Sequence, residues 1–335
     1  MKSEKTPFVV CIEEHYWDRE IADHAVRSYD SASDRRKVER LYDFGALRLK
    51  EMDEAGIDMQ VISHGAPATQ RLDAATAVPV ARRANDRLYE VIRTNPARFA
   101  AFAVLPVADP KAAADELERC VTRLGFKGAM THGLTGEGLF MDNKRFWPIF
   151  ERAAALDVPI YLHPAEPHPA VVQAYYKDYL EDFPNLLTAG WGFTVETATQ
   201  GIRMVLSGVF KAYPKLKVIL GHMGESLPFS VWRINQALGR NGKQISFQDT
   251  FREHFWITTS GNFSTPALMC SILELGVDRI LFSVDWPMVQ NKPGTDWMAQ
   301  VPLCPEDKAK ILGGNAGKLL KIDVPTKSEQ ISDAA

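Results

Sequence analysis

Short apolar runs alternate with longer amphipathic stretches along most of this 335-residue chain. Two of the runs, 218–220 and 280–282, are continuously apolar, as expected of strands that are buried on both faces. The pattern predicts eight strands, at 8–15, 59–63, 99–105, 126–131, 158–163, 217–222, 256–260 and 279–285. It also predicts amphipathic helices between them, at 47–52, 81–92, 112–124, 145–156, 196–210, 266–275 and 306–320.

The strict alternation of strands and helices predicts a fold of the α/β class. Parallel strands joined by helices form either a closed barrel or an open doubly wound sheet, and eight units in one chain favour a single (β/α)8 TIM barrel. The open sheet is the alternative, but no G-x-G-x-x-G sequence follows the first predicted strand to support it. We expect one barrel domain over residues 1–323 and a loose C-terminal tail over 324–335.

The first predicted strand ends in two carboxylates and an imidazole, Glu13-Glu14-His15. Because side chains alternate between the two faces of a strand, Glu13 and His15 point the same way and Glu14 points away from them. An isolated E-x-H sequence is more typical of a strand that runs into a polar loop than of a metal site. Here, however, later strands also end at residues that can bind a metal, namely His163, His222 with Glu225 close behind it, and Asp285.

In a parallel barrel the carboxyl ends of the strands meet at one mouth, where the chemistry of such folds takes place. The two carboxylates and three imidazoles at the strand ends should therefore converge. This donor set suits Zn²⁺ or Mn²⁺, with Mg²⁺ a further candidate, and leaves room for water or substrate. Each residue alone has a structural interpretation, such as a loop histidine at His163 or a helix N-cap at Asp285. Their joint placement favours one divalent metal ion per chain.

The composition excludes several other classes of function. The chain has 39 basic and 42 acidic residues, a formal charge of -3 and no long block of like charge, so neither a nucleic acid nor an acidic membrane surface is expected as a partner. No apolar run approaches the ~20 residues of a membrane span, and the N-terminus lacks the apolar core of a signal peptide. The 4 cysteines are scattered and are expected to be buried free thiols of a reducing compartment. We therefore expect a cytoplasmic protein.

Several longer motifs are distributed along nearly the whole chain. They are Glu13-Glu14-His15, Tyr161-Leu162-His163-Pro164, Leu220-Gly221-His222-Met223-Gly224-Glu225, Trp232-Arg233-Ile234 and Ser283-Val284-Asp285-Trp286-Pro287. As a set they resemble the branch of the amidohydrolase superfamily that is related to aminocarboxymuconate semialdehyde decarboxylase. Within that branch they are most similar to the dihydroxybenzoate decarboxylases, especially those of γ-resorcylate (2,6-dihydroxybenzoate). The set is specific for the branch and less specific for the substrate.

The resemblance implies a (β/α)8 barrel of the amidohydrolase type with one divalent metal ion, held by Glu13, His15, His163 and Asp285. Hydrolytic members of the superfamily carry H-x-H at the first strand, and a glutamate in the first position, as here, favours decarboxylation over hydrolysis. The resemblance further implies that His222 supports acid and base chemistry beside Glu225. It places Arg233 near the pocket, although Arg233 could equally form a structural ion pair.

These roles suggest a non-oxidative decarboxylation that needs no organic cofactor. An ortho-hydroxybenzoate can chelate the metal through its phenolate and one carboxylate oxygen. Because an aryl carbanion is too unstable to be left behind, the ring carbon must be protonated before CO₂ departs. We expect Asp285, kept partly protonated by the crowded pocket, to deliver that proton, and His222 with Glu225 to tune it. The reverse reaction would carboxylate a phenol.

The sequence leaves the substrate open among hydroxybenzoates such as 2,6- or 2,3-dihydroxybenzoate and a salicylate. Tyr16, Trp17 and His132 are expected to wall the pocket, and Arg48 is either a clamp for the substrate carboxylate or a surface arginine of a helix. Two other classes of function remain alternatives, a metal-dependent hydrolase of a lactone or amide with His222 as base, and a barrel without catalysis that serves in binding or assembly. The resemblance also implies a homodimer or homotetramer that acts on a small aromatic carboxylate.

Overall fold

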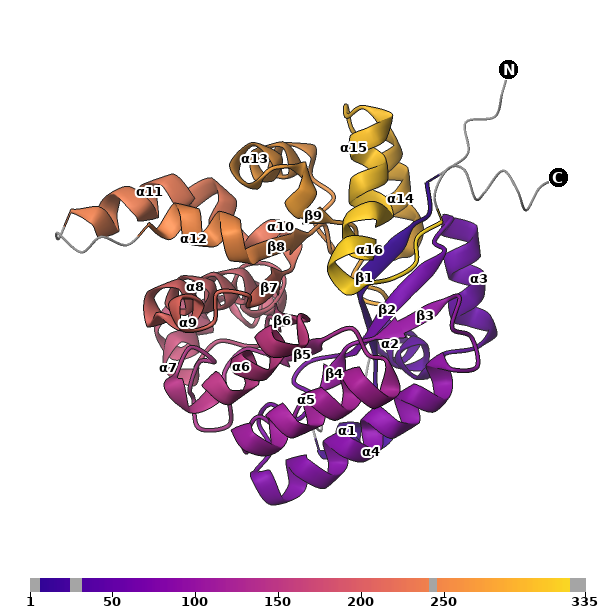
Figure 1. Ribbon diagram of the computed structural model, residues 1–335, viewed down its shortest axis with the longest axis horizontal. Helices are drawn as coiled ribbons and strands as arrows, with labels where there is room; N and C mark the ends of the chain where they lie inside the picture. Colours follow the sequence, from indigo (N-terminus) through magenta and orange to yellow (C-terminus); the bar gives the residue numbers. More distant parts are fainter. Residues whose placement is uncertain (1–6, 25–31, 241–245, 326–335) are drawn as a thin grey trace.

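The computed structural model describes residues 7–24, 32–240 and 246–325, without the side chains of 32–34. Short parallel strands form the wall of a barrel, and helices surround it (Figure 1). The strands are β1 Val10–Tyr16, β2 Met59–His64, β3 Phe99–Ala101, β4 Ala103–Val104, β5 Ala129–His132, β6 Pro159–His163, β7 Lys217–Leu220, β8 Phe255–Thr258 and β9 Ile280–Leu281. The predicted α/β class and the single barrel are confirmed.

The third predicted strand is divided at Phe102 into β3, which pairs with β2, and β4, which pairs with β5. The Phe102 amide donates to the carbonyl of Ile62 on the β2 side, at 2.9 Å, and the Ala103 amide donates to the carbonyl of Gly128 on the β5 side, also at 2.9 Å. The wall therefore passes through Phe102 without a gap. The eight predicted strands correspond to nine short segments only because of this break.

The barrel closes where β1 meets the residues that follow β9. The Asp285 amide donates to the carbonyl of Glu13 at 3.2 Å, and the His15 amide donates to the carbonyl of Trp286 at 2.7 Å. These bonds join the first and last strands of the wall at its C-terminal end. The open doubly wound sheet, which was the alternative, is wrong because its edge strands would have no such partner.

Helices link the strands and cover the outside of the barrel (Figure 1). They are α1 Arg19–His24, α2 Ala32–Tyr42, α3 Ala46–Ala55, α4 Ala74–Ile92, α5 Pro110–Leu124, α6 Trp147–Leu156, α7 Pro169–Val171, α8 Gly192–Ser207, α9 Val209–Ala212, α10 His222–Glu225, α11 Leu227–Gly239, α12 Phe247–His254, α13 Thr265–Leu275, α14 Asn291–Gln300, α15 Pro305–Ala309 and α16 Asn315–Leu320. Local signals set several of their ends. The side chains of Asp73, Asp109 and Ser264 accept from the third residue after each cap, which satisfies an amide that has no partner within the helix.

Side chains on the two faces of the strands form two hydrophobic clusters, and on β1 the register shifts between Cys11 and Glu14, so that Ile12 and Glu13 both face inward. One lies inside the barrel and includes Ile12, Val61, Phe102 and Ile219, and it continues into Leu319 of α16. The other, much larger, lies between the barrel wall and the helices. Apolar side chains thus fill the barrel below its C-terminal end, so that the polar residues of the strand ends are left at the mouth.

Three smaller expectations meet the structure with different results. Cys11 and Cys120 are buried as predicted, but Cys304 is exposed, because it precedes the short surface helix α15. Residues 326–335 of the predicted tail lie outside the described residues, whereas Val324 packs against the inner cluster. Among the described residues, no helix is both long and apolar enough to cross a membrane.

Candidate metal centre

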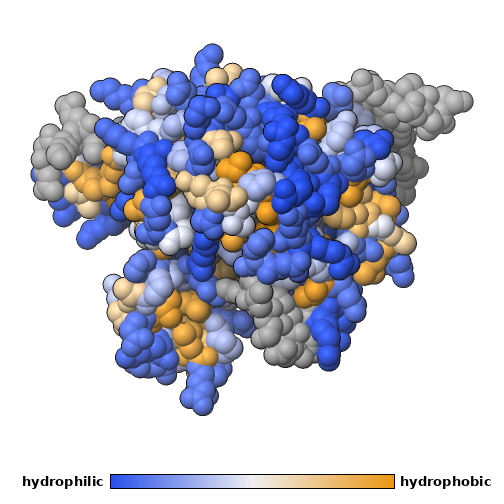
Figure 2. Space-filling view, turned by 90° about the horizontal axis from the view of Figure 1, so that it is seen from below, coloured by the Kyte–Doolittle hydropathy of each residue, from blue (hydrophilic) through white to orange (hydrophobic). Residues whose placement is uncertain are grey.

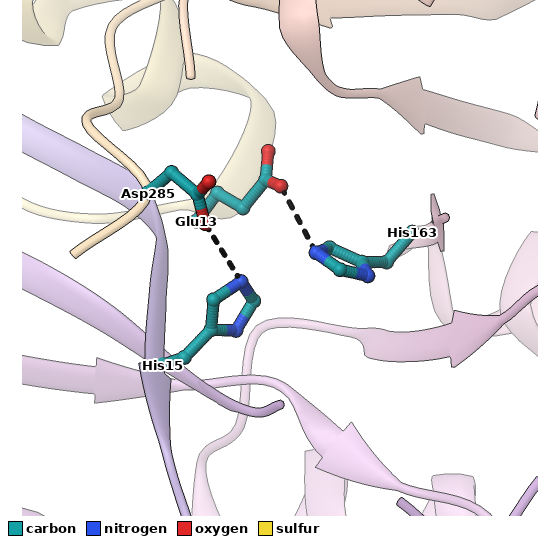
Figure 3. Close-up of side chains that lie close together, drawn as sticks. All are labelled: Glu13, His15, His163 and Asp285. Atoms are coloured by element: carbon teal, nitrogen blue, oxygen red, sulfur yellow. Dashed lines mark ion pairs between the residues drawn. The ribbon is translucent and has the colours of Figure 1, made fainter. Parts of the chain in front are cut away.

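Four side chains from three parts of the barrel wall converge at its C-terminal end (Figure 3). Glu13 and His15 come from β1, His163 ends β6, and Asp285 follows β9. His15 Nε2 lies 3.3 Å from Asp285 Oδ1, and His163 Nε2 lies 3.3 Å from Glu13 Oε1. One ligand atom from each of the four lies within 4.8 Å of all the others, close to the spread that ligands about 2.1 Å from one ion would have.

Backbone geometry makes room for this convergence. Glu13 and His15 point the same way along β1, as the alternation predicts. A Cβ atom at Gly221 would lie 2.8 Å from Glu13 Oε2, so only glycine leaves space for the carboxylate there. Asp285 has a φ of 75°, in the left-handed region, which turns its side chain toward the mouth of the barrel.

One oxygen of Glu13 is held by the protein and the other is not. Tyr161 and Thr258 both donate to Glu13 Oε2, Thr258 at 3.3 Å. Glu13 Oε1 is buried and has no hydrogen-bond partner among the described residues. A buried carboxylate oxygen without a partner is costly, and an ion bound there would satisfy it.

The two ligand histidines are oriented through the ring nitrogen that faces away from the cluster. His163 Nδ1 donates to the carbonyl of Pro164 at 2.7 Å, which leaves Nε2 free to bind an ion. His15 Nδ1 lies 3.2 Å from Ser63 Oγ, and its Nε2 is buried without a hydrogen-bond partner in the described part of the chain. Such partners fix the tautomer and the ring plane of a metal-binding histidine.

His222 stands beside the four ligand candidates. Its Nδ1 lies 2.7 Å from Glu225 Oε1, and its Nε2 lies 3.5 Å from Glu13 Oε1 and 3.8 Å from Asp285 Oδ2. Consecutive left-handed backbone conformations at 222–226 form this turn, which brings Glu225 back under the imidazole. Burial lowers the pKa of His222, but the charges of Glu13 and Glu225 outweigh burial and hold that pKa well above its usual value.

The surroundings of Asp285 act against the partial protonation that was expected. Burial raises the pKa of Asp285, but the neighbouring imidazoles of His15 and His222 outweigh burial, so the pKa is lowered overall. The crowded pocket therefore favours the carboxylate. The pKa of the neighbouring His222 is raised in turn.

Two of the predicted substrate-binding residues do not lie in the pocket. Arg48 is fully buried in the wall, where it donates to the carbonyls of His15 at 2.6 Å and Asp43 at 2.8 Å. It is therefore neither a clamp for substrate nor a surface arginine. Tyr16 belongs to the outer hydrophobic cluster, where its ring packs against Phe44 and His64. Tyr16 follows His15 on β1, so it points to the opposite face from the metal ligands.

The other three predicted pocket residues have different surroundings. Trp17 lies beside the mouth. Gly65 directly follows β2, and a Cβ atom there would approach Trp17 Nε1 to 2.9 Å. His132 is buried with its Nδ1 3.2 Å from Nδ1 of His163, so it contacts a ligand candidate. Arg233 is exposed on α11, next to the exposed Trp232.

Residues that position the cluster were missed by sequence reasoning. Tyr161 shares a face of β6 with His163 because the two are two residues apart, which is a signal that alternation offers. Thr258 ends β8, and Ser63 is the second-last residue of β2, so both are polar residues near the mouth. Nothing in the sequence indicates which ligand each one contacts.

Comparisons with known proteins agree with this geometry. A gamma-resorcylate decarboxylase of Polaromonas sp. (strain JS666 / ATCC BAA-500) is 43% identical over 296 residues, which cover 85% of this chain and 89% of that protein. A crystal structure of dihydroxybenzoic acid decarboxylase from Polaromonas sp. JS666, with bound manganese and the inhibitor 2-nitroresorcinol, superposes with a TM-score of 0.86 at 41% identity and covers 95% of this chain and 98% of that one.

A crystal structure of 2,6-dihydroxybenzoate decarboxylase complexed with 2,6-dihydroxybenzoate gives a TM-score of 0.85 at 40% identity, and it covers 94% of this chain and 100% of that one. The family model described as amidohydrolase matches residues 13–322, from the first ligand candidate to the end of the barrel. With the barrel, the E-x-H strand and the four convergent ligand candidates, this match shows that the chain belongs to the amidohydrolase family.

Proposed function

We propose that this chain is a metal-dependent, non-oxidative decarboxylase of an ortho-hydroxybenzoate, a carbon–carbon lyase that releases CO₂ and a phenol. The observation that carries the proposal is the set of Glu13, His15, His163 and Asp285 with the His222–Glu225 pair beside it. Relatives at 43% identity are gamma-resorcylate decarboxylases, which supports 2,6-dihydroxybenzoate as the first substrate to test. 2,3-Dihydroxybenzoate and salicylates are the next candidates.

The residues fit a divalent ion. Glu13 Oε1 and His15 Nε2 are buried without hydrogen-bond partners among the described side chains, as atoms that await an ion would be. Two imidazoles and two carboxylates suit Mn²⁺ and Zn²⁺, and a related crystal structure holds manganese. A bound ion would supply the positive charge that holds the phenolate and carboxylate oxygens of the substrate.

The remaining chemistry falls to the chain's own side chains. The charges of Glu13 and Glu225 raise the pKa of His222, which favours its role as the proton donor, and Glu225 fixes its ring through the 2.7 Å contact to Nδ1. Nε2 of His222 faces Asp285 Oδ2 at 3.8 Å, so a proton can pass from the imidazole to the carboxyl and from there to the ring carbon that bears the carboxylate. The carbon–carbon bond then breaks, its electron pair restores the aromatic ring, and CO₂ leaves.

The test couples metal analysis to an absorbance screen of hydroxybenzoates, with Asp285→Asn as the control variant. We expect about one metal per chain, loss of the substrate band with CO₂ release, and activity lowered at least ~100-fold in the variant, the contribution typical of a positioned general acid. Chelation should remove the activity and Mn²⁺ should restore it. Metal binding without consumption of any benzoate, together with turnover of a lactone or amide, would contradict the proposal and favour the hydrolase.

We also propose that the protein is a cytoplasmic homo-oligomer, a dimer or a tetramer. Large apolar side chains are exposed on α11, with Phe229 85% and Trp232 61% accessible, and on the segment before α8, with Tyr175 69% accessible. On the face shown in Figure 2, hydrophilic side chains are interrupted by separate apolar patches. Burial of such side chains between subunits is a common reason for their exposure in one chain. A monomeric mass by light scattering, unchanged on Trp232→Glu substitution, would contradict this.

A further inference from the structure

Glu14 stands between two ligand candidates on β1 but points to the other face of the barrel wall. It is fully buried, with an exposed fraction of 0%. It does not belong to the cluster that could hold a metal. A carboxylate placed in the wall without a partner would be strongly destabilising, so its contacts are informative.

Both oxygens of Glu14 are bound by the segment that carries Asp285. Oε1 accepts from the backbone amide of Val284 at 2.9 Å and from Ser283 Oγ at 3.0 Å, and Oε2 accepts from the amide of Trp286 at 2.9 Å. The two amides flank Asp285 on either side. One carboxylate therefore grips the backbone immediately before and immediately after Asp285.

These hydrogen bonds hold the backbone on both sides of a residue in an unusual conformation. Asp285 adopts a φ of 75°, a left-handed conformation that a non-glycine residue adopts only when its surroundings impose it. In that conformation Asp285 Oδ1 faces His15 Nε2 at 3.3 Å and Oδ2 faces His222 Nε2 at 3.8 Å. A freely turning segment would not hold both contacts at once.

The segment after β9 also contacts α3. Trp286 donates its Nε1 to Glu51 Oε2 at 2.7 Å, and the Arg48 guanidinium lies over the Trp286 ring at 3.9 Å from its centroid. Arg48 also donates to the carbonyl of His15 and interacts electrostatically with Glu14. Helix α3 and strand β1 thus both contact the segment after β9.

We propose that Glu14 is a positioning residue that holds Asp285 in the orientation required for metal binding and proton transfer. The expected effect of Glu14 on catalysis rests on the proposed function. Its expected effect on metal binding does not. Glu14 is not among the residues that could hold the ion, and it acts through the backbone on both sides of Asp285.

Glu14→Gln tests this, because its amide nitrogen would face either the Val284 or the Trp286 amide and one donor would lose its acceptor. We expect the affinity for Mn²⁺ to fall ~10–100-fold, as for other side chains that orient metal ligands, and kcat to fall with little change in KM. The absorption spectrum of the Co²⁺-substituted protein should shift as well. Glu116→Gln is the matched control, because Glu116 is also buried and paired, with Asn85 and Arg119 between α4 and α5.

A double-mutant cycle shows whether Glu14 acts through Asp285. In the Asp285→Asn background, Glu14→Gln should change Mn²⁺ affinity by less than ~2-fold, because the residue that it positions no longer contributes. A full loss of affinity in that background would overturn the proposal, as would unchanged Mn²⁺ affinity in folded Glu14→Gln. If Glu14→Gln does not fold, Glu14→Asp keeps the charge but shortens the reach to the Val284 and Trp286 amides, and unchanged Mn²⁺ affinity in that variant is then the overturning result. Mn²⁺ affinity is measured without substrate. Failure of the Glu14 proposal can therefore be distinguished from failure of the decarboxylase proposal.

Discussion

Glu13 and Glu14 are neighbours on β1 and both are fully buried, but the inner and outer faces of the barrel wall treat them in opposite ways. Inside, Glu13 keeps one oxygen without a hydrogen-bond partner among the described residues, and the charges of His222 and His163 outweigh burial and lower its pKa. Outside, both oxygens of Glu14 are bound. Burial nevertheless raises the pKa of Glu14 to about 7.

The difference shows how one strand serves two purposes. The inner face presents polar atoms that lack hydrogen-bond partners among the described residues, and an ion and a substrate could bind to them. The outer face presents a group that the protein satisfies completely, which fixes the backbone from which the inner groups project. Substitutions on the inner face should therefore change metal binding or chemistry with little loss of stability, and substitutions on the outer face should change stability as well.

The largest effect is expected from His222→Gln on the inner face. His222 lies beside the ligand set but outside it, and it carries the proton that Asp285 receives in the proposed reaction. We expect kcat to fall ~100-fold or more, the contribution of a positioned acid, while metal content stays near one per chain. Steady-state rates and metal analysis on the same preparation measure both. A variant that loses its metal would show that His222 is itself a ligand.

A smaller effect is expected from Tyr161→Phe, which removes a donor to Glu13 Oε2. Without it Glu13 is less well oriented, so the affinity for Mn²⁺ should fall ~10-fold or more with little change in melting temperature. Calorimetric titration with Mn²⁺ provides the measurement. Tyr213→Phe is the control, because the Tyr213 hydroxyl bonds Glu151 and its ring packs against the outer hydrophobic cluster. Equal losses in the two variants would remove the distinction between the faces.

The smallest effect on chemistry is expected from Arg48→Lys on the outer face. Lysine cannot reproduce both the stacking on Trp286 and the donors to His15 and Asp43. The free energy of unfolding should fall by about 1–3 kcal/mol, the cost of buried polar groups left without partners. Denaturant unfolding measures this, and kcat in the folded variant should change much less than in His222→Gln. A stable variant with a large loss of kcat would place Arg48 in the chemistry after all.

Local pattern was sufficient for the architecture and for the group of polar residues at the mouth, and the family resemblance selected the four ligands among them. The recurrence of apolar runs with helical stretches between them predicts the parallel barrel, and the strand-end residues Glu13, His15, His163 and Asp285 do meet. Both inferences depend only on facts that repeat along every strand. Side chains alternate with a period of two, and parallel strands end on the same side.

Pattern failed wherever the answer depended on a partner far away in the chain. Tyr16 and Arg48 are polar or amphipathic residues near the first strand, so a place at the pocket was a reasonable prediction for both. Tyr16 lies on the outer face, and Arg48 is drawn into the wall by carbonyl acceptors that no periodicity reveals. Asp285 was expected to be protonated, but two imidazoles from distant strands lower its pKa.

The sequence by itself thus determined the barrel, the faces of its strands and the residues at its mouth, because these follow from the periodicity of the backbone. Only the tertiary structure decided which groups orient those residues. Glu14 and Trp286, which share a hydrogen bond, are 272 positions apart, and the contact exists only because the barrel closes between β1 and the segment after β9. The placement of Asp285 is a property of that closure.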